Sequence, residues 1–186
     1  MDIRTLLHQG VLYAHLITFA IALSAVLRAD LGLLRAQRLD VARLFATARL
    51  LACALALLWL TGGALLAFDA GFNVDTWTVS PKTGTKLLVV AVLTGNGLAL
   101  HTLAFPRLRG VERRPARTTL LLVLGAISTA SWLFASFVGA SRMIAASMRL
   151  GDFLVLYALV LALAMVVALI FVRRRVERLM VAAAPL

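Results

Sequence analysis

The chain has 186 residues, of which 62% are hydrophobic, and its mean hydropathy is +0.98. Soluble globular domains are about 45–50% apolar, so this composition excludes an ordinary soluble domain. The net charge of +11 does not indicate nucleic-acid binding, because the basic residues stand at the ends of apolar runs. The single cysteine, Cys53, excludes an intrachain disulfide and a cysteine-based metal cluster.

Five apolar runs predict an all-α integral membrane protein, a single bundle of five transmembrane helices. The helices are expected at about residues 10–27, 44–68, 85–105, 118–140 and 152–172. The basic segment 31–47 is amphipathic, which is typical of a helical extension at the membrane surface or of a lipid-binding patch. Six glycines are expected to mark close helix contacts. They are Gly62, Gly63, Gly95, Gly97, Gly125 and Gly139.

The distribution of basic residues predicts the orientation of the bundle. Fourteen of the 19 fall on one side, and the other side has only Arg4, Lys82, Lys86, Arg142 and Arg149. The positive-inside rule then places the N-terminus outside and the C-terminus in the cytoplasm. We therefore expect a multi-pass protein of a bacterial inner membrane, with the lipid bilayer as its first partner.

The third run, 85–105, contains side chains that hydrocarbon disfavours. Lys86 opens it, Asn96 stands between two glycines, and His101 lies near its other end. On a helix, Lys86, Leu93, Gly97 and His101 follow one stripe. Because this stripe combines a cation, a small residue and an imidazole, we expect it to face protein rather than lipid.

The predicted orientation gathers polar and aromatic side chains in the outer half of the bundle. His15 and Lys86 fall at a similar depth, and Trp59, Trp132 and Tyr157 bring one residue each from the second, fourth and fifth runs. Intramembrane ionisable groups are candidates for function. The alternatives are a hydrogen-bonded packing histidine at position 15 and a lysine that extends to the headgroups at position 86.

Other polar residues are expected outside this layer. His101 falls near the cytoplasmic face, too far from His15 to share one haem. All eight acids lie at or beyond the predicted helix ends, which argues against a carboxylate-based ion pathway. Trp77, in the loop 69–85, is expected to be an interfacial anchor or a lid over a site.

Three features resemble a loose group of small bacterial membrane proteins: His15, Arg28 at the end of the first run, and the K-L-L-V-V-A-V-L run from Lys86. The group includes the membrane-embedded protoporphyrinogen oxidase type and the copper-resistance-protein-D type. In the former, a histidine in the first helix and a lysine opening the third are implicated around a haem b. Arg28 matches the arginine that ends the first helix. The Trp-x-Gly that the family shows after its histidine is absent from Phe19–Ser24.

The leading expectation is a haem b-binding membrane protein that acts in electron transfer or as an oxidoreductase. His15 would ligate the iron, and Lys86 would be a second ligand or a partner for a propionate. Trp59, Trp132 and Tyr157 would line the same layer. A transporter or channel for a small solute or ion, and a non-catalytic accessory subunit of a larger membrane complex, are the alternatives. A redox partner and a homo-oligomer are both compatible with the pattern, and no soluble-type catalytic motif decides whether the chain is an enzyme.

Overall fold

The computed structural model describes residues 2–35, 40–70, 80–106, 115–141, 143–144, 147–174 and 176, without the side chains of residues 70 and 115–118. Within these ranges the chain is helical apart from short turns, and it contains no strand. The helices are α1 (Ile3–Arg35), α2 (Val41–Ala70), α4 (Pro81–Ala99), α6 (Pro115–Ala140) and α7 (Leu150–Val167). Two π-helical turns, η1 (Leu100–Ala104) and η2 (Ala168–Val172), continue α4 and α7.

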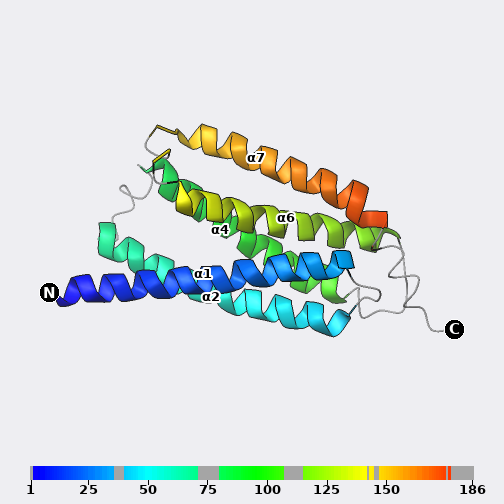
Figure 1. Cartoon of the computed structure of the whole chain (residues 1–186), viewed down its shortest axis with the longest axis horizontal. Helices are drawn as coiled ribbons and strands as arrows, with labels where there is room; N and C mark the ends of the chain where they lie inside the picture. Colours follow the sequence, from blue (N-terminus) through cyan, green and yellow to red (C-terminus); the bar gives the residue numbers. More distant parts are fainter. Residues whose placement is uncertain are drawn as a thin grey trace.

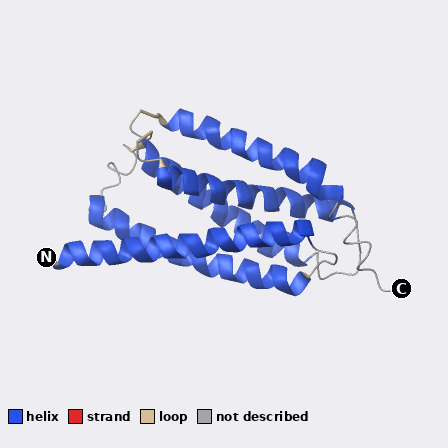
Figure 2. Cartoon of the chain, in the orientation of Figure 1, coloured by secondary structure: helices blue, strands red, loops and turns tan. Residues whose placement is uncertain are grey.

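Successive helices run in opposite directions along the long axis of the molecule (Figure 1). The start of α1 and the end of η2 consequently lie at opposite ends, as Figure 2 also shows. We call the end that holds the start of α1 and of α4 the N-terminal end of the bundle. The opposite end, which holds the end of α1 and the start of α2, is the C-terminal end.

All five long helices of the described chain are long and apolar enough to cross a membrane. The predicted all-α class with five such helices is therefore confirmed. The helix α1 extends well beyond the predicted range 10–27, since it begins at Ile3 and ends at Arg35. The charged residues Arg28 and Asp30 end the apolar run, but neither residue type ends a helix. Asp30 thus lies inside α1, and the expectation that every acid stands at or beyond a helix end is wrong.

The helices form two groups that meet across the bundle. The helix α1 packs along α2, whereas α4 and α7 pack against α6. The helix α6 is central, because 44% of its most apolar 18-residue stretch is buried, compared with 11% of the equivalent stretch of α7. Large buried side chains from α4, α6 and α7 form the core of the second group. They include Val89, Phe134, Val138, Phe153 and Tyr157.

Local polar contacts fix the N-terminal end of the bundle. The Arg4 guanidinium donates to the Phe68 carbonyl at 3.0 Å, and His8 Nε2 lies 3.1 Å from Asp69 Oδ1, so α1 and α2 are joined there. The helix α4 begins with Pro81, directly after Ser80, whose hydroxyl accepts a hydrogen bond from the Thr83 N–H. Proline at the first position and serine at the cap both favour a helix start.

Of the six glycines expected at close helix contacts, only Gly62 has such a contact. A Cβ built at Gly62 would lie 3.5 Å from His15 Cε1. A Cβ at any of the other five would meet nothing within 4 Å, so the expectation is wrong for them. Two of these five, Gly97 and Gly125, instead border a cavity inside the bundle.

Candidate functional site

A hydrogen bond between α1 and α2 orients His15. Its Nδ1 lies 2.8 Å from Thr61 Oγ1, and the Thr61 hydroxyl donates to the Leu57 carbonyl at 2.7 Å. A threonine hydroxyl has one proton, and the Leu57 carbonyl can accept it. With the proton there, the His15 ring donates through Nδ1–H to Thr61, and the lone pair stands on Nε2. This nitrogen can accept a proton or bind a metal.

Gly62 allows the imidazole of His15 to approach α2 closely. The ring atoms Cε1 and Nδ1 would lie 3.5 and 3.9 Å from a Cβ at this position, which is ordinary van der Waals contact. A side chain that branches beyond Cβ would have to share this space with the ring. Thr61 and Gly62 are consecutive, so one supplies the hydrogen-bond acceptor and the other supplies the room.

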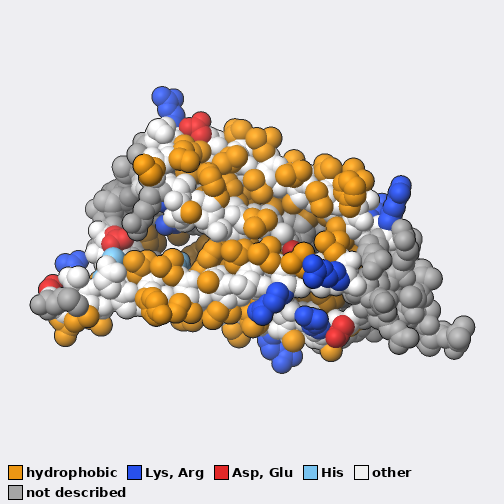
Figure 3. Space-filling view, in the orientation of Figure 1, with side chains coloured by type: hydrophobic (Ala, Val, Ile, Leu, Met, Phe, Trp, Pro, Cys, Tyr) orange, Lys and Arg blue, Asp and Glu red, His pale blue; other side chains and the backbone are white. Residues whose placement is uncertain are grey.

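Lys86 stands in the first part of α4, five residues after Pro81, and its side chain is exposed. It is close enough to His15 for a Coulombic interaction with the imidazole. That the two residues form one site stays a prediction. Figure 3 shows that the face above α1 is hollowed toward the N-terminal end, with histidine and Lys or Arg atoms at the hollow.

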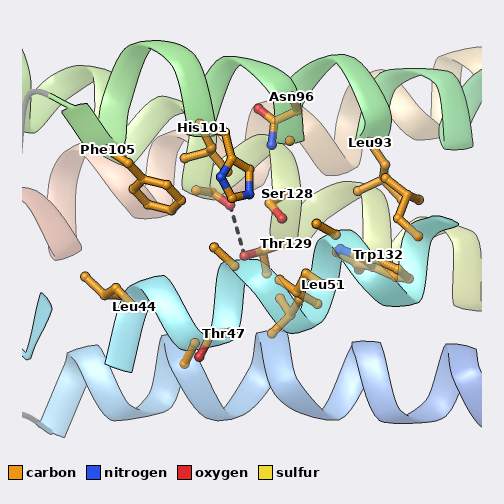
Figure 4. A pocket seen from close by; sticks show the side chains of 18 of the residues that line it. Leu44, Thr47, Leu51, Leu93, Asn96, His101, Phe105, Ser128, Thr129 and Trp132 are labelled. Carbon is orange, nitrogen blue, oxygen red and sulfur yellow. Dashed lines mark hydrogen bonds between the residues drawn. The ribbon is translucent and has the colours of Figure 1, made fainter. Parts of the chain in front are cut away.

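A cavity of about 590 Å³ lies between α1, α2, α4 and α6, farther toward the C-terminal end. Figure 4 shows side chains of α2, α4 and α6 facing one another across it, with Leu44 and Phe105 at one end and Leu93 and Trp132 at the other. Leucine and alanine make up about half of its wall. Leu93, Gly97 and His101 all border it. Leu93 is buried, whereas His101 and Lys86 are exposed, so the predicted stripe faces the protein only in part.

Asp30 is the carboxylate of the cavity wall, and the sequence analysis did not select it. Its Oδ2 accepts a hydrogen bond from the Thr129 hydroxyl of α6 at 2.7 Å, marked by the dashed line in Figure 4. The signal that could have found it is helical spacing. Val26, Asp30 and Leu33 stand four and three residues apart and all border the cavity, provided the helix continues past Arg28.

Asn96 joins α4 to α6 at the cavity wall. Its Nδ2 donates to the Leu124 carbonyl at 3.0 Å, and the residue is 7% exposed. Its Oδ1 is buried and accepts no hydrogen bond from the part of the chain that the structure describes. An amide that bonds a neighbouring helix stabilises helix association in a membrane, so this contact is structural.

The predicted site residues occupy four separate places. His15 and Lys86 form the pair near the N-terminal end. Trp59 and Trp132 instead border the cavity, where Trp59 Nε1 donates to Thr94 Oγ1 at 3.0 Å and Trp132 packs against Phe19.

The remaining predicted residues lie away from both the pair and the cavity. The Tyr157 hydroxyl lies 2.6 Å from Ser131 Oγ, between α7 and α6, and its ring stacks on Phe134. Arg28 is exposed and donates to the Ser24 carbonyl of its own helix. Trp77 is outside the described residues.

The described residues contain no group of three or more His, Cys, Asp or Glu side chains that could hold a metal ion. A metal centre built entirely from such ligands is therefore not found in these ranges. Haem iron needs only one or two axial ligands, because the porphyrin supplies the other four. His15 Nε2 meets that smaller requirement. No family model, curated protein or solved structure matches the chain.

Proposed function

We propose that the protein binds haem b within the membrane, with His15 as an axial ligand, and serves electron transfer or a membrane oxidoreductase. The observation that carries the proposal is the 2.8 Å hydrogen bond between His15 Nδ1 and Thr61 Oγ1. With Nδ1–H as its donor, the lone pair of Nε2 is available to a metal. Histidines that ligate metals commonly hold their other ring nitrogen in a hydrogen bond of this kind.

The space beside His15 and the nearby positive charge of Lys86 both support the proposal. The group α1/α2 and the helix α4 meet through few contacts, and the surface is hollowed between α1 and the helices above it (Figure 3). Lys86, across from His15, would be a second ligand or would pair with a haem propionate. Haem would supply one-electron chemistry, and the chain would ligate it, orient it and exclude water.

The proposed site is smaller than the layer predicted from the sequence. It keeps His15 and Lys86 and adds Thr61 as the residue that positions the imidazole. Tyr157 is already hydrogen-bonded between α6 and α7, and Arg28 is exposed on its own helix. Neither residue has a part in the proposed site.

We further propose that the chain lies in a bacterial inner membrane with the N-terminal end of the bundle outside. The excess of basic residues at the C-terminal end supports this orientation. Reporter fusions after Arg117 and after Arg178 are expected to report cytoplasm. A fusion within residues 71–79 is expected to report the outside, and a cytoplasmic result there would reverse the proposed orientation.

Haem titration into purified protein in a mild detergent tests the proposed ligand. Protein carrying His15→Ala is expected to lose haem binding, because the substitution removes a direct bond to iron. His8→Ala is the matched control. His8 lies on the same helix, and its ring pairs with Asp69 rather than facing α4. Equal haem affinity in the two variants would exclude His15 as the ligand.

A further inference from the structure

The cavity has a distinct charge pattern. Asp30 and His101 are the titratable side chains among the described residues of its wall, and no lysine or arginine borders it there. The rest of the wall is mainly leucine and alanine, with a few hydroxyl groups and Asn96. An ionised Asp30 therefore gives the cavity a negative site, and no described side chain gives it a fixed positive one.

Asp30 has little hydrogen bonding for a carboxylate in these surroundings. Its Oδ2 accepts from Thr129, but the same hydroxyl lies 3.1 Å from the Gly125 carbonyl, so one proton serves two acceptors. Asp30 forms no ion pair with a described residue. A charged group at membrane depth is stable when it is paired or well hydrogen-bonded. A cation beside Asp30 would supply that pairing.

The end of the cavity nearer His15 presents aromatic surface. Trp132 lies about one helical turn from Thr129 on α6, and Trp59 of α2 also borders the cavity. The Trp59 N–H is already donated to Thr94, so its indole offers ring surface rather than a hydrogen bond. Indole faces attract cations and pack well against apolar groups.

We propose that the cavity binds a lipophilic organic cation, with the charged group beside Asp30 and the apolar body against the leucines and indoles of the wall. The volume of about 590 Å³ lies in the range of small-molecule sites. This site does not rest on haem binding, because neither His15 nor Lys86 borders the cavity.

Two probes of the same shape and opposite charge test the proposal, the tetraphenylphosphonium cation and the tetraphenylborate anion. Binding is measured by equilibrium dialysis of the full chain in detergent, with protein-free micelles as the blank. The phosphonium is expected to bind saturably. The borate is expected neither to bind at the same site nor to compete with the phosphonium.

Asp30→Asn removes the charge and nearly keeps the shape. Its affinity for the phosphonium is expected to fall at least about tenfold, since the cation loses its buried counter-charge. Asp40→Asn is the control. Asp40 is exposed before α2 and accepts a hydrogen bond from the Arg43 N–H, a bond that asparagine can keep.

Ala56→Phe tests the cavity without changing a charge. Ala56 borders the cavity, whereas the neighbouring Leu57 is 45% exposed and does not. Ala56→Phe is expected to weaken phosphonium binding by filling the space, and Leu57→Phe is expected to leave the affinity unchanged. If Asp30→Asn fails to fold, the comparison of Ala56→Phe with Leu57→Phe still tests whether the phosphonium binds in the cavity.

The proposal is overturned if the borate binds as tightly as the phosphonium, or if neither Asp30→Asn nor Ala56→Phe weakens phosphonium binding. His15→Ala should bind the phosphonium as the unaltered protein does. Haem loss in that variant with phosphonium binding retained would show two independent sites. If His15→Ala loses both haem binding and phosphonium binding, the two sites are not separate, and the placement of the cation in the cavity is overturned.

Discussion

The pair of His15 and Lys86 and the cavity around Asp30 are built in different ways. At the pair, one hydrogen bond between His15 Nδ1 and Thr61 Oγ1 orients the imidazole, and the space lies between two groups of helices that make few contacts. At the cavity, apolar side chains from four helices define a volume, and one carboxylate supplies its charge. The first region offers a ligand for a metal, whereas the second offers room for an amphiphilic molecule.

The two regions are close along α2 but use different residues. Trp59 borders the cavity, and Thr61, two residues later, bonds His15. Substitutions should therefore act on one region without the other. A substitution that disturbs both would show that they form a single site.

The largest expected effect is the difference in haem absorption between substitutions of the two histidines, one in each region. His15→Ala should abolish most of the haem absorption, and His101→Ala should leave it unchanged, because His101 borders the cavity on η1 and not the pair. Absorption spectra of the two purified variants measure this. Equal loss in both variants would require a second haem ligand at the cavity.

A smaller effect is expected at the residue that orients His15. Thr61→Val removes the acceptor of the Nδ1–H and should weaken haem affinity about 10- to 100-fold. Thr102→Val is the matched control, since Thr102 donates to the Leu98 carbonyl of its own helix and contacts no histidine ring through a hydrogen bond. Haem titration of both variants measures the difference. Unchanged affinity in Thr61→Val would remove Thr61 from the site.

The smallest effect is expected at Thr129, and it concerns stability. Thr129→Val leaves Asp30 without its hydrogen bond and should lower the free energy of unfolding by about 1 kcal/mol. Thr47→Val should cost less, because Thr47 also borders the cavity but donates only to the Arg43 carbonyl of its own helix. Denaturant unfolding in detergent measures both. Haem affinity should stay the same in each, and a parallel loss would contradict the separation of the two regions.

The sequence was sufficient for the number of long apolar helices, because the length of an apolar run is read directly from it. The choice of His15 and Lys86 rests on the rarity of ionisable groups within such runs and stays a prediction. The partner of His15 was not predictable in the same way. Thr61 is one of several threonines in the helices, and only the packing of α1 on α2 selects it.

The cavity was not predictable, because no single residue type in a sequence indicates an open space between packed helices. Ala48, Ala52 and Ala56 border it at helical spacing, but an alanine stripe is equally typical of close helix packing. The sequence does not predict Asp30 as a residue of the bundle interior, because it places the end of the first helix before Asp30. The structure continues α1 to Arg35, and that continuation turns the carboxylate toward α6.

The most direct test of the central claim is the absorption spectrum of the purified full chain after haem reconstitution. The proposed ligation by His15 Nε2 predicts a coloured protein with a haem b Soret band that shifts on reduction. Protein that stays colourless after reconstitution, while still folded and helical, would contradict haem binding at His15.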